Sequence, residues 1–154
     1  MNRQRAFRVP IKRLQEFAAG ARRALRLPPE SFTVCLVTSA EIAKWNRAYR
    51  HKSGPTDVLS FPAENDASPR KKRHSPRREG FTSHPEIDSN YLGDIAIAPA
   101  VARRNARRFG RTFSREMCIL ILHGMLHLMG YDHETDTGQM ERRELRLRRQ
   151  LGLA

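Results

Sequence analysis

Apolar residues recur along the first part of the chain with a helical period and then in a short continuous run. Residues 10–27 carry an apolar stripe at helical spacing and basic residues on the other sides, so they predict an amphipathic helix with Pro10 in its first turn. The stripe comprises Ile11, Leu14, Phe17, Ala18, Ala21 and Leu25. Residues 32–37 are rich in β-branched and apolar side chains, which is typical of a strand.

Cap and turn signals divide the next part of the chain into a helix and two strands. Thr38 and Glu41 have the spacing of a capping box, and the helix that they begin is expected to run to about Tyr49. Strands are expected at residues 57–61 and 93–98, where short apolar runs are bounded by Pro or Gly.

Two more amphipathic helices are expected in the second half. One begins at Pro99 and ends at Gly110, and the other begins near Asp136 and Gln139. Their inward residues are Ala102, Ala106 and Phe109 on the first helix and Met140, Leu147 and Leu151 on the second. Their outward faces carry Arg103, Arg104, Arg107 and Arg108, and Arg142, Arg143, Arg146 and Arg149. Such a face is typical of a solvated helix surface, and RNA binding is the alternative.

Between these two helices, residues 117–122 are apolar on every side, which predicts a buried helix rather than an amphipathic one. Thr112 or Ser114 is expected to cap it, and Gly130 to end it. Strands interleaved with helices indicate one α+β or α/β domain over residues 1–154, with a sheet flanked by helices. We expect the buried helix to lie across that sheet as its central element.

The segment at 63–90 is long for a connection between strands. Its middle, residues 69–78, holds six basic residues, two prolines and no aliphatic side chain. Such a sequence cannot bury enough apolar surface to fold, so we expect a basic, mobile loop. An electrostatic arm for RNA and an insertion without specific contacts both remain open.

The 29 Lys and Arg against 16 Asp and Glu leave a net charge of +13. This surplus predicts a polyanionic partner, nucleic acid first and an anionic membrane surface second. Arg dominates the surplus, and its planar fork suits phosphate better than the Lys point charge does.

The expected compartment is the cytoplasm. No apolar run reaches the length of a membrane span, and the N-terminal residues lack the apolar core of a secretory signal. Cys35 and Cys118 both lie in apolar runs without a C-x-x-C pattern, so they are expected to be reduced core residues.

Three histidines form the most specific pattern in the chain. His123 and His127 stand at i and i+4, so on a helix they project from one face. Gly130 lets the chain turn back after them, and His133 can then approach the same point. Three neutral imidazoles with a fourth position left open describe a catalytic zinc site, because structural sites are usually closed by four protein ligands.

The same stretch fits the H-x-x-x-H-x-x-G-x-x-H ligand skeleton of the metzincin proteases. Those proteases need Glu directly after the first His as a general base, and here that position is Gly124. A zinc peptidase is therefore an alternative that Gly124 and the basic charge both oppose.

The stretch HG-x-LHL-x-GYDH instead resembles the signature of the YbeY family of metal-dependent endoribonucleases. Two further blocks occur in the same order, Asn46-x-x-Tyr49-Arg50 followed by residues 56–62, and Leu92-Gly-Asp-Ile95. Met140 and Glu144 occupy the matching downstream positions. The resemblance extends from about Val9 to the C-terminus, and the segment at 63–90 departs from it by its length and basic charge.

The resemblance implies a small α+β fold with a mixed sheet of about four strands. It implies that His123, His127 and His133 hold one Zn²⁺ per chain and that Arg50 is a catalytic residue. The implied activity is endonucleolytic cleavage of single-stranded RNA in ribosomal RNA processing, notably 16S rRNA 3′-end maturation, and in ribosome quality control. The implied partners are the rRNA precursor and the small subunit or its associated proteins. A non-catalytic RNA- or ribosome-binding module stiffened by metal is a third alternative.

Physical chemistry makes this function coherent. Zinc lowers the pKa of its bound water to about 7, so hydroxide is available without the missing glutamate. A guanidinium at Arg50 would neutralise charge that develops on the phosphate, although Arg50 could equally satisfy carbonyls at a helix end. Asp132 could orient His133 or a neighbour, or stabilise a turn.

Overall fold

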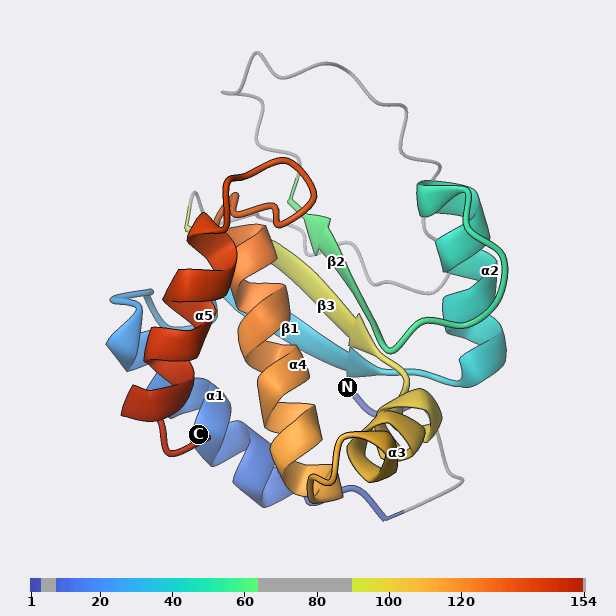
Figure 1. Cartoon of the computed structure of the whole chain (residues 1–154), viewed down its shortest axis with the longest axis horizontal. Helices are drawn as coiled ribbons and strands as arrows, with labels where there is room; N and C mark the ends of the chain where they lie inside the picture. The colour runs from blue at the N-terminus through green and yellow to red at the C-terminus, as the bar shows by residue number, and fades with distance from the viewer. Residues whose placement is uncertain (4–7, 64–89, 154) are drawn as a thin grey trace.

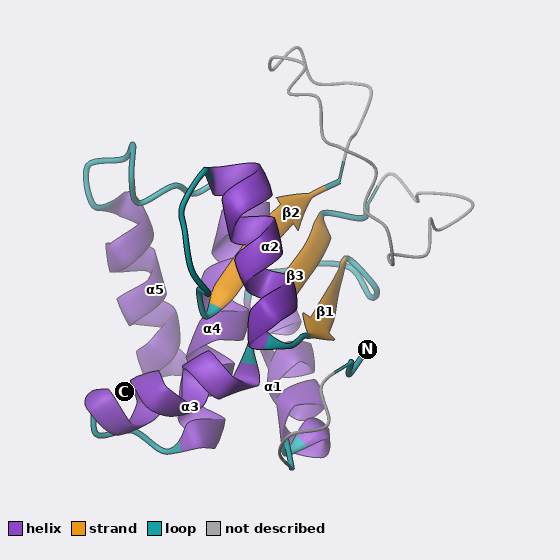
Figure 2. Ribbon diagram, turned by 90° about the vertical axis from the view of Figure 1, so that its right-hand side faces the viewer, coloured by secondary structure: helices purple, strands orange, loops and turns teal. Residues whose placement is uncertain are grey.

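A mixed sheet of three strands lies at the centre of the computed structural model, with helices on both of its faces (Figures 1 and 2). The structure describes residues 1–3, 8–63 and 90–153, so the predicted mobile loop falls outside the described residues except at its two ends. The elements in chain order are α1 (Ile11–Ala24), β1 (Phe32–Leu36), α2 (Ser39–Arg50), β2 (Val58–Pro62), β3 (Gly93–Ile97), α3 (Pro99–Arg108), α4 (Phe113–Leu128) and α5 (Gln139–Gln150). The small α+β architecture is the one that the sequence predicts.

The sheet has the order β1-β3-β2, with β1 parallel and β2 antiparallel to the central strand β3. The predicted sheet of about four strands therefore has one strand more than the described residues form. Residues 1–3 lie along the outer edge of β1 and form one isolated bridge there, between Asn2 and Leu36. The Leu36 N–H donates to the Met1 carbonyl, and the Arg3 N–H donates to the Leu36 carbonyl. Asn2 and Arg3 lack the alternating apolar pattern of a half-buried strand, and no ladder is formed by residues 1–3.

The strands separate two apolar clusters because successive side chains point to opposite faces. On β3, Ile95 and Ile97 belong to the larger cluster, which contains most of α4, while Ala96 belongs to the smaller one. Ile42 of α2 completes the smaller cluster, with Trp45 packed against it. The two views show the same layers, with α4 on one face of the sheet and α2 on the other (Figures 1 and 2).

The predicted caps are present. Thr38 and Glu41 form both hydrogen bonds of a capping box at α2, and the Thr112 hydroxyl accepts from the backbone N–H of Arg115 at the start of α4. Before α5, the Asp136 carboxylate accepts from the backbone N–H groups of Gly138, Gln139 and Met140. These bonds satisfy donors that a helix start leaves free, so local sequence fixes where α2, α4 and α5 begin.

One of the inward residues predicted for α3 is wrong. Ala102 and Ala106 of α3 are buried, but the Phe109 side chain is 53% exposed. The helix ends at Arg108 and Phe109 is its C-cap, so its side chain leaves the inward stripe.

The prediction for α4 is confirmed, since it is buried on nearly all sides and contacts both β2 and β3 as well as α1, α3 and α5. Cys35 and Cys118 are buried free thiols. Among the described helices, none has the length and apolar character needed to cross a membrane.

Candidate metal centre

The C-terminal end of α4 and the segment after it bring the three predicted histidines together. His123 and His127 lie on successive turns of the helix, and Gly130, at φ 95°, reverses the chain so that Tyr131 N–H donates to the Leu126 carbonyl at 3.1 Å. One ring nitrogen from each of His123, His127 and His133 lies within 4.8 Å of the others. Such a group could hold a metal ion.

The spacing of two of these nitrogens is compatible with one metal ion. The Nε2 atoms of His123 and His127 are 3.1 Å apart. Two nitrogens that bind one tetrahedral zinc at about 2.0–2.1 Å lie roughly 3.3 Å from each other. Among the described residues, no fourth His, Cys, Asp or Glu joins this group, and His133 is exposed. Three candidate ligands without a fourth protein donor are typical of an open metal site.

Glu144 of α5 is the residue that fixes the orientation of His123. Its carboxylate lies 2.9 Å from Nδ1 of His123, and the other carboxylate oxygen accepts from the Arg148 guanidinium. A carboxylate accepts only, so Nδ1 carries the proton and the Nε2 lone pair faces the other two imidazoles. This is how protein metal sites commonly set the tautomer of a ligating His.

The electrostatics favour a carboxylate at Glu144 and a neutral imidazole at His127. Burial would raise the pKa of the Glu144 carboxyl, but the hydrogen bond and charge of His123 and the charge of Arg148 outweigh it, so the pKa is lowered. Burial, followed by the neighbouring His123 and His133, lowers the pKa of His127. A carboxylate and a neutral imidazole are the states that a metal site uses.

The role of Glu144 was not foreseen from the residues, although a signal for it existed. Met140, Glu144 and Leu147 form one helical stripe, and all three are buried. An acidic residue within an apolar stripe needs a buried partner, and here that partner is His123. The Asp132 carboxylate accepts from the backbone N–H of Glu134 at 3.0 Å, and this bond lowers its pKa. The turn-stabilising alternative for Asp132 is therefore the one that the hydrogen bonding supports.

Gly124 brings the histidine-bearing helix close to the sheet. A Cβ atom at Gly124 would lie 2.6 Å from Cγ2 of Ile95, which is fully buried on β3. The Ser60 hydroxyl on β2 donates to the Gly124 carbonyl at 3.2 Å. A glutamate after the first His would have to occupy the space of Ile95, so this packing leaves no room for a metzincin-type base.

Arg50 lies at the last position of α2, and its side chain reaches the segment that carries His133. Its guanidinium pairs with the Glu134 carboxylate at 2.6 Å, and Lys52 Nζ contacts the same oxygen at 3.3 Å. Hydrogen bonding from Lys52 and the charge of Arg50 lower the pKa of Glu134. The recorded partner of Arg50 is thus a carboxylate next to a candidate ligand, and its catalytic role stays a prediction.

Comparisons with known proteins agree with one another. The family model described as Endoribonuclease YbeY matches residues 2–152. A curated Endoribonuclease YbeY from Sulfurovum sp. is 33% identical over 99% of this chain and 90% of its own length, and one from Solibacter usitatus is 39% identical over 79% and 67%. The solution structure of TM1509 from Thermotoga maritima superposes with a TM-score of 0.57 at 25% identity, covering 98% of this chain and 89% of that one.

Proposed function

Because the chain belongs to the YbeY family of endoribonucleases, we propose that it is a zinc-dependent endoribonuclease that cleaves single-stranded RNA. The single observation that supports the metal dependence best is the group of His123, His127 and His133, with ring nitrogens within 4.8 Å. We assign these three residues as the ligands of one zinc ion per chain. When bound there, zinc supplies Lewis acidity toward a phosphoryl oxygen and a water acidified to a pKa near 7.

The protein groups around the site position the ion and the substrate. Glu144 holds His123 in the ligating tautomer, and Ser60 ties the helix to β2 beside it. In this proposal Arg50 exchanges its contact with Glu134 for a phosphate oxygen of the substrate, since its fork fits two oxygens at once. The positive charge that Arg50 brings would stabilise charge developing on the phosphate.

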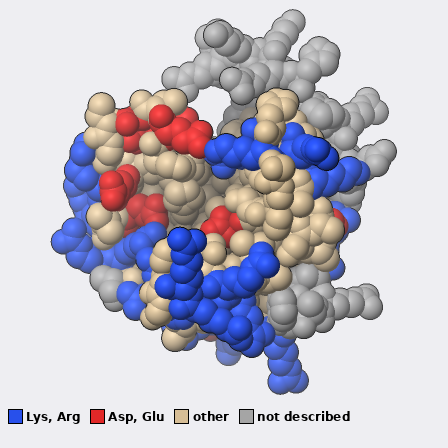
Figure 3. All heavy atoms as spheres, turned by 45° about the vertical axis from the view of Figure 1, so that its right-hand side comes forward, with Lys and Arg blue, Asp and Glu red and all other residues tan. Residues whose placement is uncertain are grey.

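The expected substrate is a ribosomal RNA precursor, with 16S rRNA 3′-end maturation and ribosome quality control as the processes. The net charge of +13 favours a polyanion. Exposed arginines on α3 and α5 add basic surface, and Lys and Arg occupy much of the face in Figure 3. The expected partners are the small ribosomal subunit or its associated proteins, and the expected compartment is the cytoplasm.

A zinc peptidase is the second candidate, because the three histidines have the metzincin spacing. The packing of Gly124 on Ile95 opposes it, since the base that such an enzyme needs has no space there.

Elemental analysis of the purified protein, paired with two activity assays, tests the proposal. The wild type is expected to hold one zinc per chain, to cut single-stranded RNA and to leave a peptide library intact. The His123→Ala/His127→Ala double variant should lose both the metal and the cleavage. His51→Asn is a matched control, because it removes an imidazole outside the group at a C-cap with φ 55° that Asn tolerates.

Three results would contradict the proposal. Stoichiometric zinc in the double variant would refute the ligand assignment. Chelator-sensitive peptide hydrolysis with intact RNA would favour the peptidase. Tight RNA binding by the metal-loaded wild type without any cleavage would indicate that the protein is a non-catalytic binding module.

A further inference from the structure

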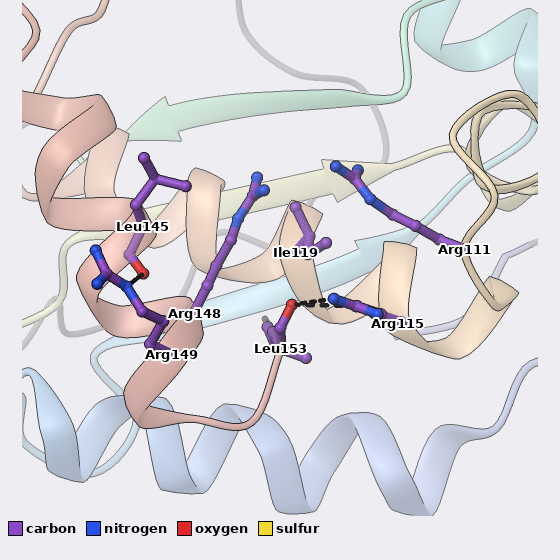
Figure 4. A pocket seen from close by; sticks show the side chains of 7 residues that line it. All are labelled: Arg111, Arg115, Ile119, Leu145, Arg148, Arg149 and Leu153. Carbon is purple, nitrogen blue, oxygen red and sulfur yellow. Dashed lines mark hydrogen bonds between the residues drawn. The ribbon is translucent and has the colours of Figure 1, made fainter.

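A second polar site lies between α4 and α5, on the side of Glu144 away from the histidines. It is a pocket of about 360 Å³ (Figure 4). Its lining combines four arginines with three aliphatic side chains: Arg111, Arg115, Arg148, Arg149, Ile119, Leu145 and Leu153. Four arginines around one pocket bring like charges near one another, and like charges repel. In Figure 4 the Arg149 guanidinium lies beside Leu145 of its own helix rather than beside those of Arg111, Arg115 and Arg148.

The protein neutralises only part of this charge. Arg111 pairs with Glu116 at 2.8 Å, Arg148 pairs with Glu144, and Arg115 donates to the backbone carbonyl of Leu153. Among the described residues, two carboxylates pair with these four guanidinium groups, which leaves an excess of two positive charges around the pocket.

Donors also remain unused. Each guanidinium has five N–H groups. Arg148 Nε is buried without a hydrogen-bond partner among the described residues. The exposed Arg149 makes a single weak contact, 3.4 Å from Nε to the Leu145 carbonyl of its own helix. The pocket therefore offers donors and charge to an oxyanion, and its forked donors match phosphate.

The pocket and the histidines share one face of α4. Arg115, Ile119 and His123 follow one another at i, i+4 spacing, so they lie in one row along the helix. A helix rises about 1.5 Å per residue, which places Ile119 roughly 6 Å before His123 along the axis. On α5 the same relation holds, since Glu144 bonds His123 and Arg148, one turn later, lines the pocket. A single extended strand lying along this face would meet both sites.

An exposed aromatic ring contacts Arg111, one of the residues that line the pocket. Phe109 is 53% exposed, and the Arg111 guanidinium lies 5.0 Å from its ring centroid. Proteins that bind single strands commonly combine a positive groove with an aromatic side chain on which a base stacks. This pairing of an arginine-lined pocket with Phe109 favours a nucleotide over a simple inorganic anion.

We propose that this pocket binds a backbone phosphate of the RNA strand whose scissile bond lies at the histidines, with Phe109 stacking on a neighbouring base. The inference rests on the proposed function and adds to it a subsite along α4. Arg149 is the phosphate contact most available to substrate, because its structural contact is weakest.

The test compares two charge reversals on α5, Arg149→Glu in the pocket and Arg146→Glu outside it. Both arginines are exposed and both changes alter the net charge equally. Binding of the metal-loaded protein to a labelled single-stranded RNA is measured by anisotropy on ice, before products form. Arg149→Glu should weaken binding about tenfold, the effect of losing a hydrogen-bonded charge contact, and flatten the salt slope by about 0.7. Arg146→Glu should change the affinity no more than about threefold.

Cleavage kinetics and metal content give independent readouts. Arg149→Glu is expected to raise KM while kcat and zinc content stay at wild-type values. Phe109→Ala should weaken RNA binding about tenfold, as expected for a lost stacking contact, whereas Phe109→Tyr should retain it. If charge reversal at Arg149 lowers the melting temperature, the same RNA-binding measurement is made on Arg149→Ala and Arg146→Ala instead.

Equal weakening by both reversals, or none by either, would refute the pocket as a phosphate site. A second arm measures the rise in melting temperature on adding inorganic phosphate. If wild-type protein neither binds nor cuts RNA but phosphate stabilises it in a way that requires Arg149, the assignment to an RNA strand is overturned together with the proposed function. If Arg149→Glu and Phe109→Ala both bind and cleave RNA like the wild type, this inference is refuted while the proposed function stands.

Discussion

At the scale of single residues, Glu144 is the best test of how the histidine group is organised. Both partners of its carboxylate, His123 and Arg148, are donors. In Glu144→Gln the amide can accept from only one of them and presents its own N–H groups to the other. We expect the zinc affinity to fall about 10- to 100-fold, as measured by competition with a chromophoric chelator.

Glu141→Gln is the matched control for this change, because Glu141 is exposed in the first turn of the same helix and loses the same charge. It should bind zinc like the wild type. Wild-type affinity in Glu144→Gln would mean that the carboxylate does not orient the ligand.

Arg50 poses a different question, since its present partner is Glu134 rather than a substrate. Arg50→Lys keeps the charge but loses the bidentate fork, so kcat should fall on the order of tenfold or more while zinc content and melting temperature persist. Single-turnover RNA cleavage and a thermal melt provide the two measurements.

Lys52→Met is the control, because Lys52 contacts the same oxygen of Glu134 and is more exposed than Arg50. If Arg50 acts only by holding Glu134, both variants should have similar activity. A large loss of stability with normal turnover per folded molecule would give Arg50 a structural role.

At the scale of elements, the close approach of α4 to β3 decides how much room the site has. Adding a methyl group at Gly124 places it 2.6 Å from Ile95 Cγ2, and Ile95 is enclosed in the central strand. Overpacking of this kind costs about 1–3 kcal/mol, against a gain of roughly 1 kcal/mol in helix propensity. We expect Gly124→Ala to lower the free energy of unfolding by up to about 2 kcal/mol in urea denaturation.

Gly20 on α1, unlike Gly124, has space for a side chain. A Cβ there would meet nothing closer than the flexible Arg23 side chain at 3.9 Å, so Gly20→Ala should stabilise the protein by about 0.5–1 kcal/mol. Stabilisation by both substitutions would show that α4 can move away from the sheet.

At the scale of the whole molecule, the positive charge predicts how RNA binding responds to salt. If binding is mainly electrostatic, log K should fall linearly with log salt, with a slope near −0.7 for each phosphate contacted. Anisotropy titrations between about 50 and 300 mM salt measure this slope, and several contacts are expected from the net charge of +13.

An uncharged peptide nucleic acid of the same base sequence is the control, because it has no phosphates. It should bind weakly and without salt dependence. RNA binding with no salt dependence would exclude the electrostatic interpretation of the charge.

Local signals in the sequence determined the elements and the histidine motif. The capping box of Thr38 and Glu41, Pro99 at a helix start and Gly130 after the last turn of α4 act within a few residues, so the sequence alone locates these boundaries. His123 and His127 were placed on one face by the helical period, and the motif with His133 identified the family. These inferences need no long-range contact.

The tertiary structure decided which distant residues meet. The pairing of Glu144 with His123, the reach of Arg50 to Glu134 and the gathering of four arginines between α4 and α5 join residues from different elements. The sheet ends at three strands in the described residues because edge pairing depends on neighbours as well as on local pattern. Helical periods and caps are local properties, whereas these contacts follow from how apolar faces pack, and packing is set by the whole chain.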